Sequence, residues 1–316
     1  MRKILITGGF GFIGGRLSKK LSSEFSIIAS SRKKMEADVL EKHGNIEQVQ
    51  HKQLLSGSDF PQGIHTVIHL AALNEWDSVQ YPSEAIRVNI DETRIILENS
   101  IANKVEQFIY FSTAHVYGSR LQGSIDEEKL AVPLHPYAIT HKAAEDYVIS
   151  ASLQKKIHSI VVRLSNSFGA PVFPEVNRWT LLANDLCRQA IEKEKLVLLS
   201  NGCQYRDFIC LTDVEQVIHE IIIRGDHFFK KNIYNLGAGS SLRVIDMANA
   251  IAEEFENILK KRIPIELPKG SQPSEEPFFN YNINRLISEG IEIKNDFRKE
   301  LAQLLSFCKQ NFTKTD

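Results

Sequence analysis

A glycine-rich turn near the start of the chain constrains the fold more than any other feature. Residues Thr7–Gly14 read TGGFGFIG, between a short apolar run at Lys3–Thr7 and a helical pattern over Phe12–Leu21. Glycines spaced three apart allow a tight turn, close approach of the backbone to a pyrophosphate and close packing of helix on strand. The N–H groups and dipole of a helix start would hold that anion. We therefore predict a dinucleotide site. Its expected residues are Gly8, Phe10, Gly11, Phe12, Ile13 and Gly14. A plain turn is the alternative, since glycines also punctuate ordinary loops.

Short apolar segments alternate with helical patterns through the first half of the chain. Buried strands are expected at Lys3–Thr7, Ser26–Ala29, His65–Ala72, Gln107–Ser112 and Ser159–Leu164. Amphipathic helices are expected at about Ser83–Ala102 and Tyr137–Leu153. This alternation predicts an α/β fold, a Rossmann-type doubly wound parallel sheet with right-handed crossovers.

The pattern changes after about residue 170. Pro171 and Pro174 break the alternation, and longer helices are expected at about Thr180–Lys193 and Leu242–Leu259. We predict a dinucleotide-binding domain over 1–170, to which 206–236 return, and a smaller C-terminal substrate-binding lobe made of 171–205 and 237–316. Within this lobe, Ser240 or Ser241 is expected to cap the second helix.

Composition excludes several classes of protein. The 316 residues are 43% hydrophobic and 24% charged, which is typical of a globular protein rather than a disordered one. The net charge of -1 argues against nucleic acid as a partner. Four cysteines without metal-ligand spacing predict no metal site. There is no apolar run of the ~20 residues that span a bilayer, and the run at Met1–Gly9 is too short for a signal peptide, so we expect a cytoplasmic protein that does not bind membranes.

The end of the second predicted strand bears on the choice of cofactor. NAD-binding proteins place an acidic side chain there to bind the ribose 2′-hydroxyl. This chain reads ASSRK over Ala29–Lys33, and its next acid is Glu36. The Ser31 hydroxyl and the Arg32 guanidinium suit a 2′-phosphate, which favours NADP(H) over NAD(H). The alternative is a solvated basic turn that serves NAD(H).

Further motifs follow the glycine turn along the chain. They are His69-Leu70-Ala71-Ala72, Val88-Asn89 with Thr93, Phe111-Ser112-Thr113 leading to Val116-Tyr117-Gly118, Tyr137 at a helix start, Arg163-Leu164-Ser165-Asn166 with Gly169, and Arg206-Asp207-Phe208 before Asp213. In this order they resemble the extended short-chain dehydrogenase/reductase family, in its NAD(P)-dependent nucleotide-sugar epimerase/dehydratase branch, over almost the whole chain. The resemblance implies cofactor contacts from Leu70, Ala71, Ala72 and Asn89, and a role in polysaccharide biosynthesis.

The family's catalytic group consists of a Ser or Thr, a Tyr and a Lys four residues after the Tyr. The resemblance places Thr113 and Tyr137 in the first two roles, but the fourth residue after Tyr137 is His141, and the lysine is Lys142. At about 100° per residue, His141 returns to the face of Tyr137 and Lys142 does not. We expect Tyr137 to be the acid/base and His141 to bind the nicotinamide ribose and favour tyrosinate. The alternative is that catalysis is weak or lost and His141 only binds ribose.

Two other histidines lie near these motifs. His69 falls in a predicted buried strand and is expected to be a satisfied core group or a cofactor neighbour rather than a base. His115, two residues after Thr113, fits a site residue and a strand-end surface residue equally well.

The substrate half carries a second signal for an anion. The resemblance implies that Arg206 contacts the diphosphate of a nucleotide sugar, that Asn166 lies by the sugar and the nicotinamide, and that Asn177 helps to enclose the nucleotide. Thr113 and Tyr137 would also contact the substrate. For Arg206 the alternative is an ion pair with Asp207 or Asp213.

The resemblance also limits the reaction. The 4,6-dehydratases of the family carry Asp-Glu directly after the hydroxyl residue, where this chain has Ala114 and His115, so dehydration is disfavoured. Oxidation at a ring carbon, usually C4, leads either to an epimer or to a net 4-reductase or dehydrogenase with exchangeable cofactor. Tyr81 stands where 4-epimerases of the family carry Lys. A non-catalytic dinucleotide-binding regulatory protein is the competing class.

The resemblance implies a partner as well. Relatives pair the helices that correspond to Ser83–Ala102 and Tyr137–Leu153 in a dimer, so we expect a homodimer. The sequence leaves the nucleotide open among UDP, GDP, dTDP and CDP.

Overall fold

The computed structural model describes residues 1–35, 46–119, 121–272 and 274–313. It divides into two compact units. Unit 1 comprises Met1–Leu121, Glu127–Leu164 and Val217–Asn235, and unit 2 comprises Gln122–Asp126, Ser165–Gln216 and Leu236–Asp316. The sequence placed the first boundary near residue 170 and the returning segment at 206–236. The structure has them at Leu164 and at Val217–Asn235.

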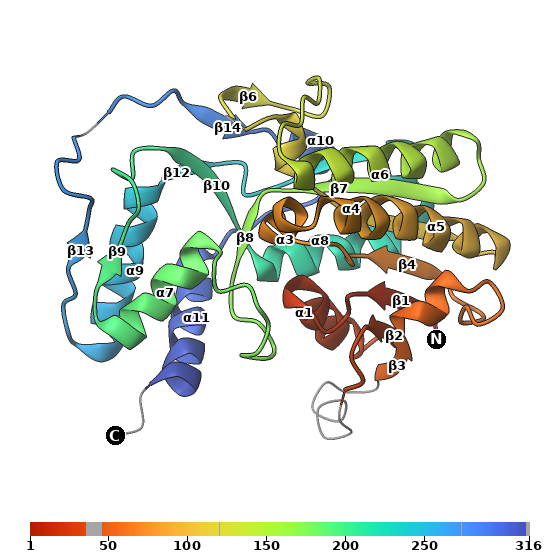
Figure 1. The fold of residues 1–316 in the computed structure, drawn as a ribbon, viewed down its shortest axis with the longest axis horizontal. Helices are drawn as coiled ribbons and strands as arrows, with labels where there is room; N and C mark the ends of the chain where they lie inside the picture. The colour runs from red at the N-terminus through yellow and green to blue at the C-terminus, as the bar shows by residue number, and fades with distance from the viewer. Residues whose placement is uncertain (36–45, 120, 273, 314–316) are drawn as a thin grey trace. The chain divides into compact units, whose positions relative to one another are not determined.

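Unit 1 is built on a seven-stranded sheet in the order β11-β7-β5-β4-β1-β2-β3 (Figure 1). The strands are β1 Lys3–Thr7, β2 Ser26–Ser31, β3 Ile46–Gln50, β4 Thr66–His69, β5 Gln107–Thr113, β7 His158–Leu164 and β11 Ile233–Leu236. β1 lies between β2 and β4 and runs parallel to both, with Thr7 opposite Ser30 on one side and His69 on the other. The predicted α/β fold with a doubly wound parallel sheet is confirmed.

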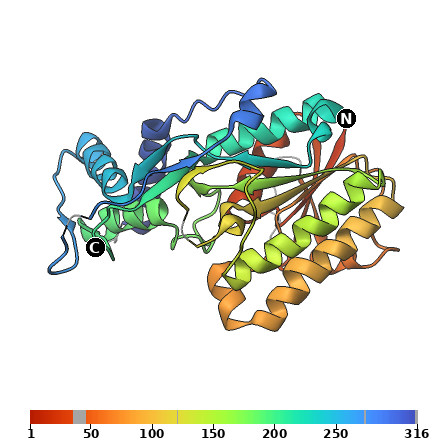
Figure 2. The same ribbon diagram turned by 90° about the horizontal axis from the view of Figure 1, so that it is seen from above.

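Helices cover both faces of this sheet. The long ones are α1 Phe12–Leu21, α5 Thr93–Ala102, α6 Pro136–Leu153 and α8 Leu211–Arg224, which belongs to unit 1 from Val217 on. The short ones are η1 His51–Leu55, η3 Ala114–Tyr117 and η4 Gly225–Lys230. Figure 2 shows α5 and α6 side by side on one face and α8 on the other. The core under α5 and α6 includes Phe108 of β5, Ile96 of α5 and Val148 of α6, all fully buried. Burial of such side chains is the main force that holds helix to sheet.

The segment between β4 and β5 departs from the single helix that we predicted over Ser83–Ala102. It consists of α3 Glu75–Gln80, α4 Pro82–Ala85, a π-helical stretch η2 over Ile86–Glu92, and then α5. A π-helix inserts an extra residue per turn and is frequent at functional sites. Here it contains the buried Asn89.

The described residues of unit 2 form small sheets and several helices. The strands are β8 Asn166–Phe168, β10 Tyr205–Cys210 and β12 Ser241–Arg243 in one sheet, β6 Gly123–Ile125 with β14 Phe279–Tyr281, and β9 Leu196–Val197 with β13 Ile265–Glu266. The helices are α7 Leu182–Lys193, α9 Val244–Leu259, α10 Asn284–Ser288 and α11 Phe297–Phe312. Cys187 of α7, Ile251 of α9 and Leu304 of α11 are fully buried in a second core.

The expected capping of α9 is wrong. Ser241 belongs to β12, which pairs antiparallel with β10 and places Ser241 opposite Asp207. α9 begins at Val244, its N-cap is Arg243, and no side chain caps it. Pairing with β10 therefore takes up the residues that we expected to start the helix.

Candidate active site

The glycine turn is too crowded for side chains at two positions. A Cβ on Gly14 would lie 2.1 Å from the carbonyl oxygen of Gly8, and one on Gly9 would lie 2.6 Å from the Cβ of Ala29. Gly8 itself has a φ of +65°, a left-handed conformation that favours glycine. The turn therefore requires glycine at positions 8, 9 and 14.

The turn leaves the start of α1 open. Its N-cap is Gly11, and no side chain there bonds to the helix N–H groups. The side chains of Phe10 and Phe12 are buried, so these residues can contact a ligand only through their backbone atoms. A helix start with uncapped N–H groups suits a phosphate or pyrophosphate. The residues present therefore fit the diphosphate of a dinucleotide.

Thr7, at the end of β1, ties the turn to the end of β4. Its Oγ1 accepts hydrogen bonds from the backbone N–H groups of Leu70 and Ala71, each at 3.0 Å. A Cβ on Gly8 would lie 3.4 Å from the nitrogen of Ala71. Leu70, Ala71 and Ala72 are half-buried. Two of the predicted cofactor segments thus lie side by side at the carboxyl ends of neighbouring strands, where α/β sheets bind ligands.

His69 is a core group, as the sequence indicated. Its Nδ1 lies 2.8 Å from Oγ1 of Thr7, and its Nε2 lies 2.9 Å from Oγ1 of Thr93. Burial, with smaller effects from the charges of His51 and His141, lowers the pKa of His69 to about 3. The ring is therefore neutral at physiological pH and does not serve as a base.

Asn89 is committed to the protein framework. Its Oδ1 accepts from the N–H of Leu73 at 2.7 Å, and its Nδ2 donates to Oγ1 of Thr140 at 2.9 Å. It thereby joins η2 to the segment after β4 and to Thr140 of α6. The structure thus uses the Asn89 amide within unit 1.

Tyr137 and His141 meet on one face of α6. Their ring centroids are 4.4 Å apart and their planes are inclined by 65°. Tyr137 is half-buried and His141 is 3% exposed. Lys142 instead pairs with Asp146 one turn along the helix. The predicted helical register is confirmed: the histidine, and not the lysine, accompanies the tyrosine.

Thr113 stands at the end of β5 and caps η3. Its Oγ1 accepts from the N–H of His115 at 3.2 Å, and its side chain is buried. His115 is half-buried within η3. Among the described residues, no direct hydrogen bond between the side chains of Thr113 and Tyr137 is present.

A buried ion pair joins α6 to β7, and the sequence analysis did not predict it. Arg163 of β7 donates to both carboxylate oxygens of Glu145 of α6, at 2.9 and 2.7 Å. The guanidinium also lies 4.7 Å from the centre of the Tyr117 ring. Arg163 is 3% exposed and Glu145 is not exposed. The pair fixes the helix that carries Tyr137 to the sheet.

Ser31 and Arg32 lie at and just after the end of β2. Oγ of Ser31 accepts from the N–H of Lys33 at 3.1 Å, and the Arg32 side chain is exposed. The pKa of Glu84 is lowered chiefly by its hydrogen bond from Arg87, with a smaller effect from the charge of Arg32. The Arg32 guanidinium is therefore accessible to a ligand, and the Glu84 carboxylate lies in its surroundings.

In unit 2 the pairing of β8 with β10 brings Asn166 opposite Phe208. Nδ2 of Asn166 donates to the carbonyl oxygen of Asp207 at 3.0 Å. Oδ1 of Asp207 accepts from Ser165 at 2.5 Å and from the N–H of Ala238 at 2.8 Å. Burial raises the pKa of Asp207 to about 6. Two of the predicted motifs thus form one hydrogen-bonded cluster.

Among the described residues, neither Asp207 nor Asp213, the two aspartates considered as ion-pair partners of Arg206, forms an ion pair with it. Oδ1 of Asp207 has the partners given above, and Asp213 accepts from the N–H groups of Lys294 and Asn295, each at 3.1 Å. Among the residues that the structure describes, Arg206 has no carboxylate partner. Its side chain is half-buried, and burial lowers its pKa. A half-buried guanidinium without a counter-charge is suited to an anionic ligand.

Asn177 is not brought to this cluster. It lies exposed in the loop before α7, and in the described ranges no hydrogen bond joins it to Asn166 or Arg206.

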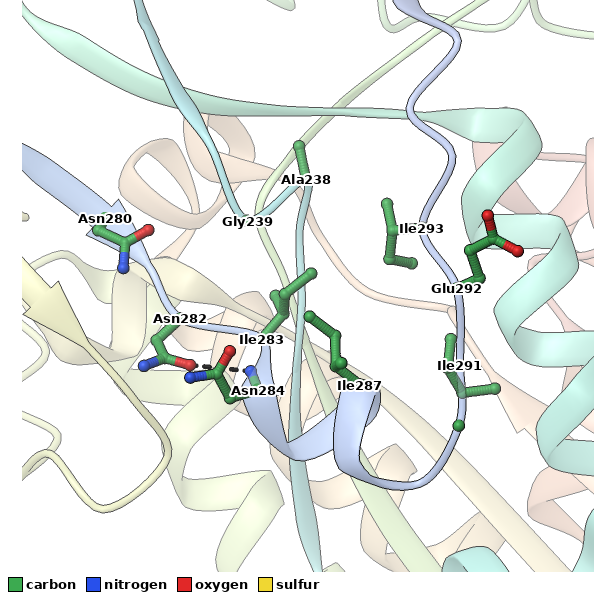
Figure 3. A pocket seen from close by; sticks show the side chains of 11 residues that line it. Ala238, Gly239, Asn280, Asn282, Ile283, Asn284, Ile287, Ile291, Glu292 and Ile293 are labelled. Atoms are coloured by element: carbon green, nitrogen blue, oxygen red, sulfur yellow. Dashed lines mark hydrogen bonds between the residues drawn. The ribbon is translucent and has the colours of Figure 1, made fainter.

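Unit 2 also contains a pocket of about 510 Å³. Figure 3 shows asparagines on one side and isoleucines on the other, and the N–H of Asn284 donates to Oδ1 of Asn282. The lining residues are Ala238, Gly239, Asn280, Asn282, Ile283, Asn284, Ile287, Gly290, Ile291, Glu292 and Ile293. None of the predicted site residues is among them.

Metal ligands and membrane spans were also considered for the described ranges of the molecule. No set of three or more His, Cys, Asp or Glu side chains is arranged to hold a metal ion. No described helix combines the length and apolar character needed to cross a membrane.

Comparison with known proteins gives relatives over most of the chain. The model of the NAD dependent epimerase/dehydratase family matches residues 4–237. The human dTDP-D-glucose 4,6-dehydratase is 27% identical over 272 residues, which covers 80% of this chain and 73% of that protein.

Two solved structures share the fold. The UDP-N-acetylglucosamine 4-epimerase of Methanobrevibacter ruminantium, in complex with UDP-N-acetylmuramic acid, has a TM-score of 0.81 at 20% identity and covers 97% of both chains. The UDP-glucuronic acid 4-epimerase of Bacillus cereus, in complex with UDP-glucuronic acid and NAD, has a TM-score of 0.79 at 24% identity and covers 98% of this chain and 99% of that one. The family match spans the glycine turn, the strand ends and the Tyr137 helix described above, and the chain therefore belongs to the NAD dependent epimerase/dehydratase family of nucleotide-sugar enzymes.

Proposed function

We propose that this protein is an NAD(P)-dependent oxidoreductase or epimerase that acts on a nucleotide-activated sugar at a ring carbon, C4 in the first instance. The observation that carries the proposal is the contact between Tyr137 and His141, with ring centroids 4.4 Å apart. The contact supports the proposal that the imidazole of His141 takes the role of the lysine that supports the acid/base tyrosine in the family.

The cofactor would be held by unit 1. The open start of α1 and the turn Gly8–Gly14 suit the diphosphate, and the segment Leu70–Ala72 forms the adjoining wall. When bound, the nicotinamide supplies hydride transfer to and from the sugar carbon. The protein supplies the proton chemistry and the orientation.

Three side chains carry that proton chemistry. Tyr137 takes a proton from, or returns it to, the sugar hydroxyl at its Oη. Thr113 polarises the same oxygen, and His141 binds the nicotinamide ribose and favours the tyrosinate. General acid–base catalysis of this kind contributes about 10²–10⁴-fold to the rate.

For the cofactor we favour NADP(H) over NAD(H). The exposed Arg32 and the hydroxyl of Ser31 at the end of β2 support this choice, because a guanidinium pairs well with a 2′-phosphate. The structurally similar UDP-glucuronic acid 4-epimerase is in complex with NAD, which is the alternative cofactor for this protein.

For the substrate we propose a diphosphate contact from Arg206 and a sugar contact from Asn166, with Asn177 nearer the nucleotide. The absence of any carboxylate partner for Arg206 among the described residues supports the first assignment. The second rests on the hydrogen bond that joins Asn166 to the β10 backbone beside Arg206.

The reaction type is chosen on two residues. The human relative is a 4,6-dehydratase, but Ala114 and His115 of η3 stand where dehydratases of the family have an acidic pair, so we favour redox chemistry without loss of water. Return of the hydride to the same sugar gives an epimerase. Exchange of the cofactor gives a 4-reductase or dehydrogenase.

The deciding experiment is Tyr137→Phe, assayed on a panel of UDP-, GDP-, dTDP- and CDP-sugars. We expect turnover to fall about 10²–10⁴-fold with cofactor affinity retained. Tyr147→Phe, an exposed tyrosine on the same helix, is the control. Unchanged turnover in Tyr137→Phe would refute the mechanism. Wild-type protein that binds cofactor and turns over no sugar would support the regulatory alternative.

The nucleotide released on denaturation separates the two enzymatic outcomes. Retained NAD(H) or NADP(H), identified by mass spectrometry, would favour an epimerase that returns its hydride to the same sugar. Protein that is isolated empty but binds added cofactor would favour the exchanging 4-reductase or dehydrogenase.

We also propose a homodimer. Large apolar side chains are exposed on the segment from Tyr81 to η2 and on α6; they include Tyr81, Ile86 and Ile139. Such a concentration is costly in water unless it is covered, and a second copy of the same two helices would cover it. Sedimentation at micromolar concentration should give the dimer mass, and Ile139→Lys should shift it to the monomer. A wild-type protein at monomer mass would exclude the dimer.

A further inference from the structure

Tyr110 is a buried tyrosine that the catalytic proposal does not use. It lies on β5, is 2% exposed, and is the cross-strand neighbour of His69 on β4. The rings of Tyr110 and His69 are stacked, with centroids 5.9 Å apart and planes inclined by 23°. Its Oη lies 2.8 Å from Nδ1 of His141. The phenol is thus fixed by the sheet and directed at the histidine beside Tyr137.

The direction of this hydrogen bond can be assigned. Burial, with smaller effects from the charges of Glu145 and Tyr137, raises the pKa of Tyr110 well above its ordinary value, so the phenol keeps its proton. A buried O–H needs an acceptor. Within the described part of the chain, Nδ1 of His141 is the hydrogen-bond partner that the structure gives to this hydroxyl. Tyr110 therefore donates to Nδ1.

That direction determines where the neutral imidazole carries its proton. A ring nitrogen that accepts a hydrogen bond is unprotonated, so the hydrogen is on Nε2. If His141 takes up a second proton, Nδ1–H donates to the phenol oxygen instead, and Nε2 keeps its hydrogen. The same pair of atoms accommodates both states.

We infer that Tyr110 is a positioning residue that holds the ring of His141 in one orientation with hydrogen on Nε2, so that the pair presents a permanent donor. A lysine ammonium is a donor at every physiological pH, whereas a histidine alone can exchange tautomers and turn its ring. Tyr110 removes this freedom. That this donor serves the nicotinamide ribose and Tyr137 rests on the proposed function. The assignment of the His141 tautomer rests only on its hydrogen bond with Tyr110.

Other titratable groups around His141 do not replace Tyr110 in this role. His69 on β4 is occupied by Thr7 and Thr93. Tyr137 meets the imidazole edge to face. Glu145, one turn further along α6, is held by Arg163 of β7.

The direct test is the tautomer of His141 in the cofactor-free protein. Imidazole ¹⁵N NMR of the wild type, with the resonances of His141 identified by their loss in His141→Lys, should show a protonated Nε2 and an unprotonated Nδ1 at pH 8. Hydrogen on Nδ1 would overturn the inference without any variant at Tyr110.

The second test is the affinity for NADPH and NADH, measured by fluorescence. Tyr110→Phe should weaken binding about fivefold, the size expected for one buried hydrogen bond. Tyr234→Phe, which removes another buried tyrosine hydrogen bond in unit 1 (to the carbonyl of Phe228, 2.8 Å), should leave affinity within about twofold. Equal losses in the two variants would mean that Tyr110 is merely structural.

The third test places Tyr110→Phe in the His141→Lys background. If Tyr110 acts through His141, the second substitution should change affinity less than about twofold there. The same fivefold loss in both backgrounds would overturn the inference. None of these readouts needs turnover, so failure of the Tyr137 mechanism would be seen separately, in the nucleotide-sugar assay.

Discussion

Nδ1 of His69 lies 2.8 Å from Oγ1 of Thr7, at the point where the glycine turn leaves β1. Nε2 of the same ring lies 2.9 Å from Oγ1 of Thr93 on α5. A neutral imidazole has one donor and one acceptor nitrogen, so it can satisfy both hydroxyls, whereas an imidazolium has two donors and no acceptor. The ring thus joins strand, turn and helix in its neutral form.

This contact predicts a loss of stability in acid. The pKa of His69 is about 3 in the folded protein and 6.5 in the reference state, so the unfolded chain binds the extra proton between these values. The contribution of His69 is complete above pH 6.5 and falls as the pH drops toward 3, by up to about 1.4 kcal/mol per pH unit. Urea unfolding at pH 7 and pH 5 should show a loss of about 2 kcal/mol from this ring.

The variant His69→Gln isolates this effect, because glutamine does not titrate. Its stability should fall less between pH 7 and pH 5 than that of the wild type. Asp207 acts in the opposite sense, because its raised pKa of about 6 makes stability decrease as pH rises from 3.8 through 6, but it acts equally in both proteins. Identical pH slopes for the two proteins would exclude His69 as the acid-sensitive group.

Gly14→Ala tests the close contact within the glycine turn. The added Cβ would lie 2.1 Å from the carbonyl oxygen of Gly8, so turn and helix must separate. We expect a destabilisation of about 1–3 kcal/mol and a loss of affinity for NADPH and NADH of at least about tenfold. Gly57→Ala is the matched control, since its Cβ would make an ordinary contact at 3.4 Å with Asn99. Unchanged cofactor affinity in Gly14→Ala would show that the turn is not the binding site.

Arg32→Ala tests the cofactor preference. Loss of a charge-assisted contact with a 2′-phosphate should weaken NADPH binding about tenfold or more and leave NADH binding unchanged. Lys20→Ala, which removes an exposed cation in the last turn of α1, should alter neither affinity. Equal effects of Arg32→Ala on both cofactors, in a fluorescence titration, would contradict the NADP(H) assignment.

Glu145→Gln tests the ion pair under α6. It leaves the buried Arg163 guanidinium without its counter-charge, and we expect about 3–5 kcal/mol of lost stability in urea unfolding. Glu98→Gln breaks an ion pair with Arg94 on α5 in which the glutamate side chain is 59% exposed, and it should cost no more than about 1 kcal/mol. A small effect for Glu145→Gln would mean that water or another group replaces the carboxylate.

The parts of the fold that the sequence predicted are those whose conformation is determined by residues adjacent in the chain. β1 and α1 have the predicted bounds, since an apolar run, a glycine turn and an amphipathic pattern adjoin one another. β3 was missed because IEQVQ at Ile46–Gln50 contains only two apolar residues, and its pairing with β2 decides its conformation. The π-helical turn at Ile86–Glu92 likewise depends on tertiary partners, among them the hydrogen bonds of Asn89.

The same division holds for the candidate site. Helical periodicity alone placed His141 beside Tyr137 and Lys142 away from it. The contact between Tyr110 and His141 joins β5 to α6, and no spacing along the chain predicts it, although a tyrosine within a buried strand is a signal that its hydroxyl has a partner. The surroundings of Arg206 also required the structure, because the sequence does not show which groups Asp207 and Asp213 contact.

The discontinuous composition of unit 1 has a consequence during synthesis on the ribosome. β7 is synthesised with the segment that ends at Leu164. Its neighbour β11 begins only at Ile233, so it is synthesised after part of unit 2. At about 5–20 residues per second, the nascent protein exposes an apolar strand edge for several seconds before its partner exists. Chaperone dependence of newly made chains should therefore be greatest in that interval, and truncations ending between the two strands should aggregate.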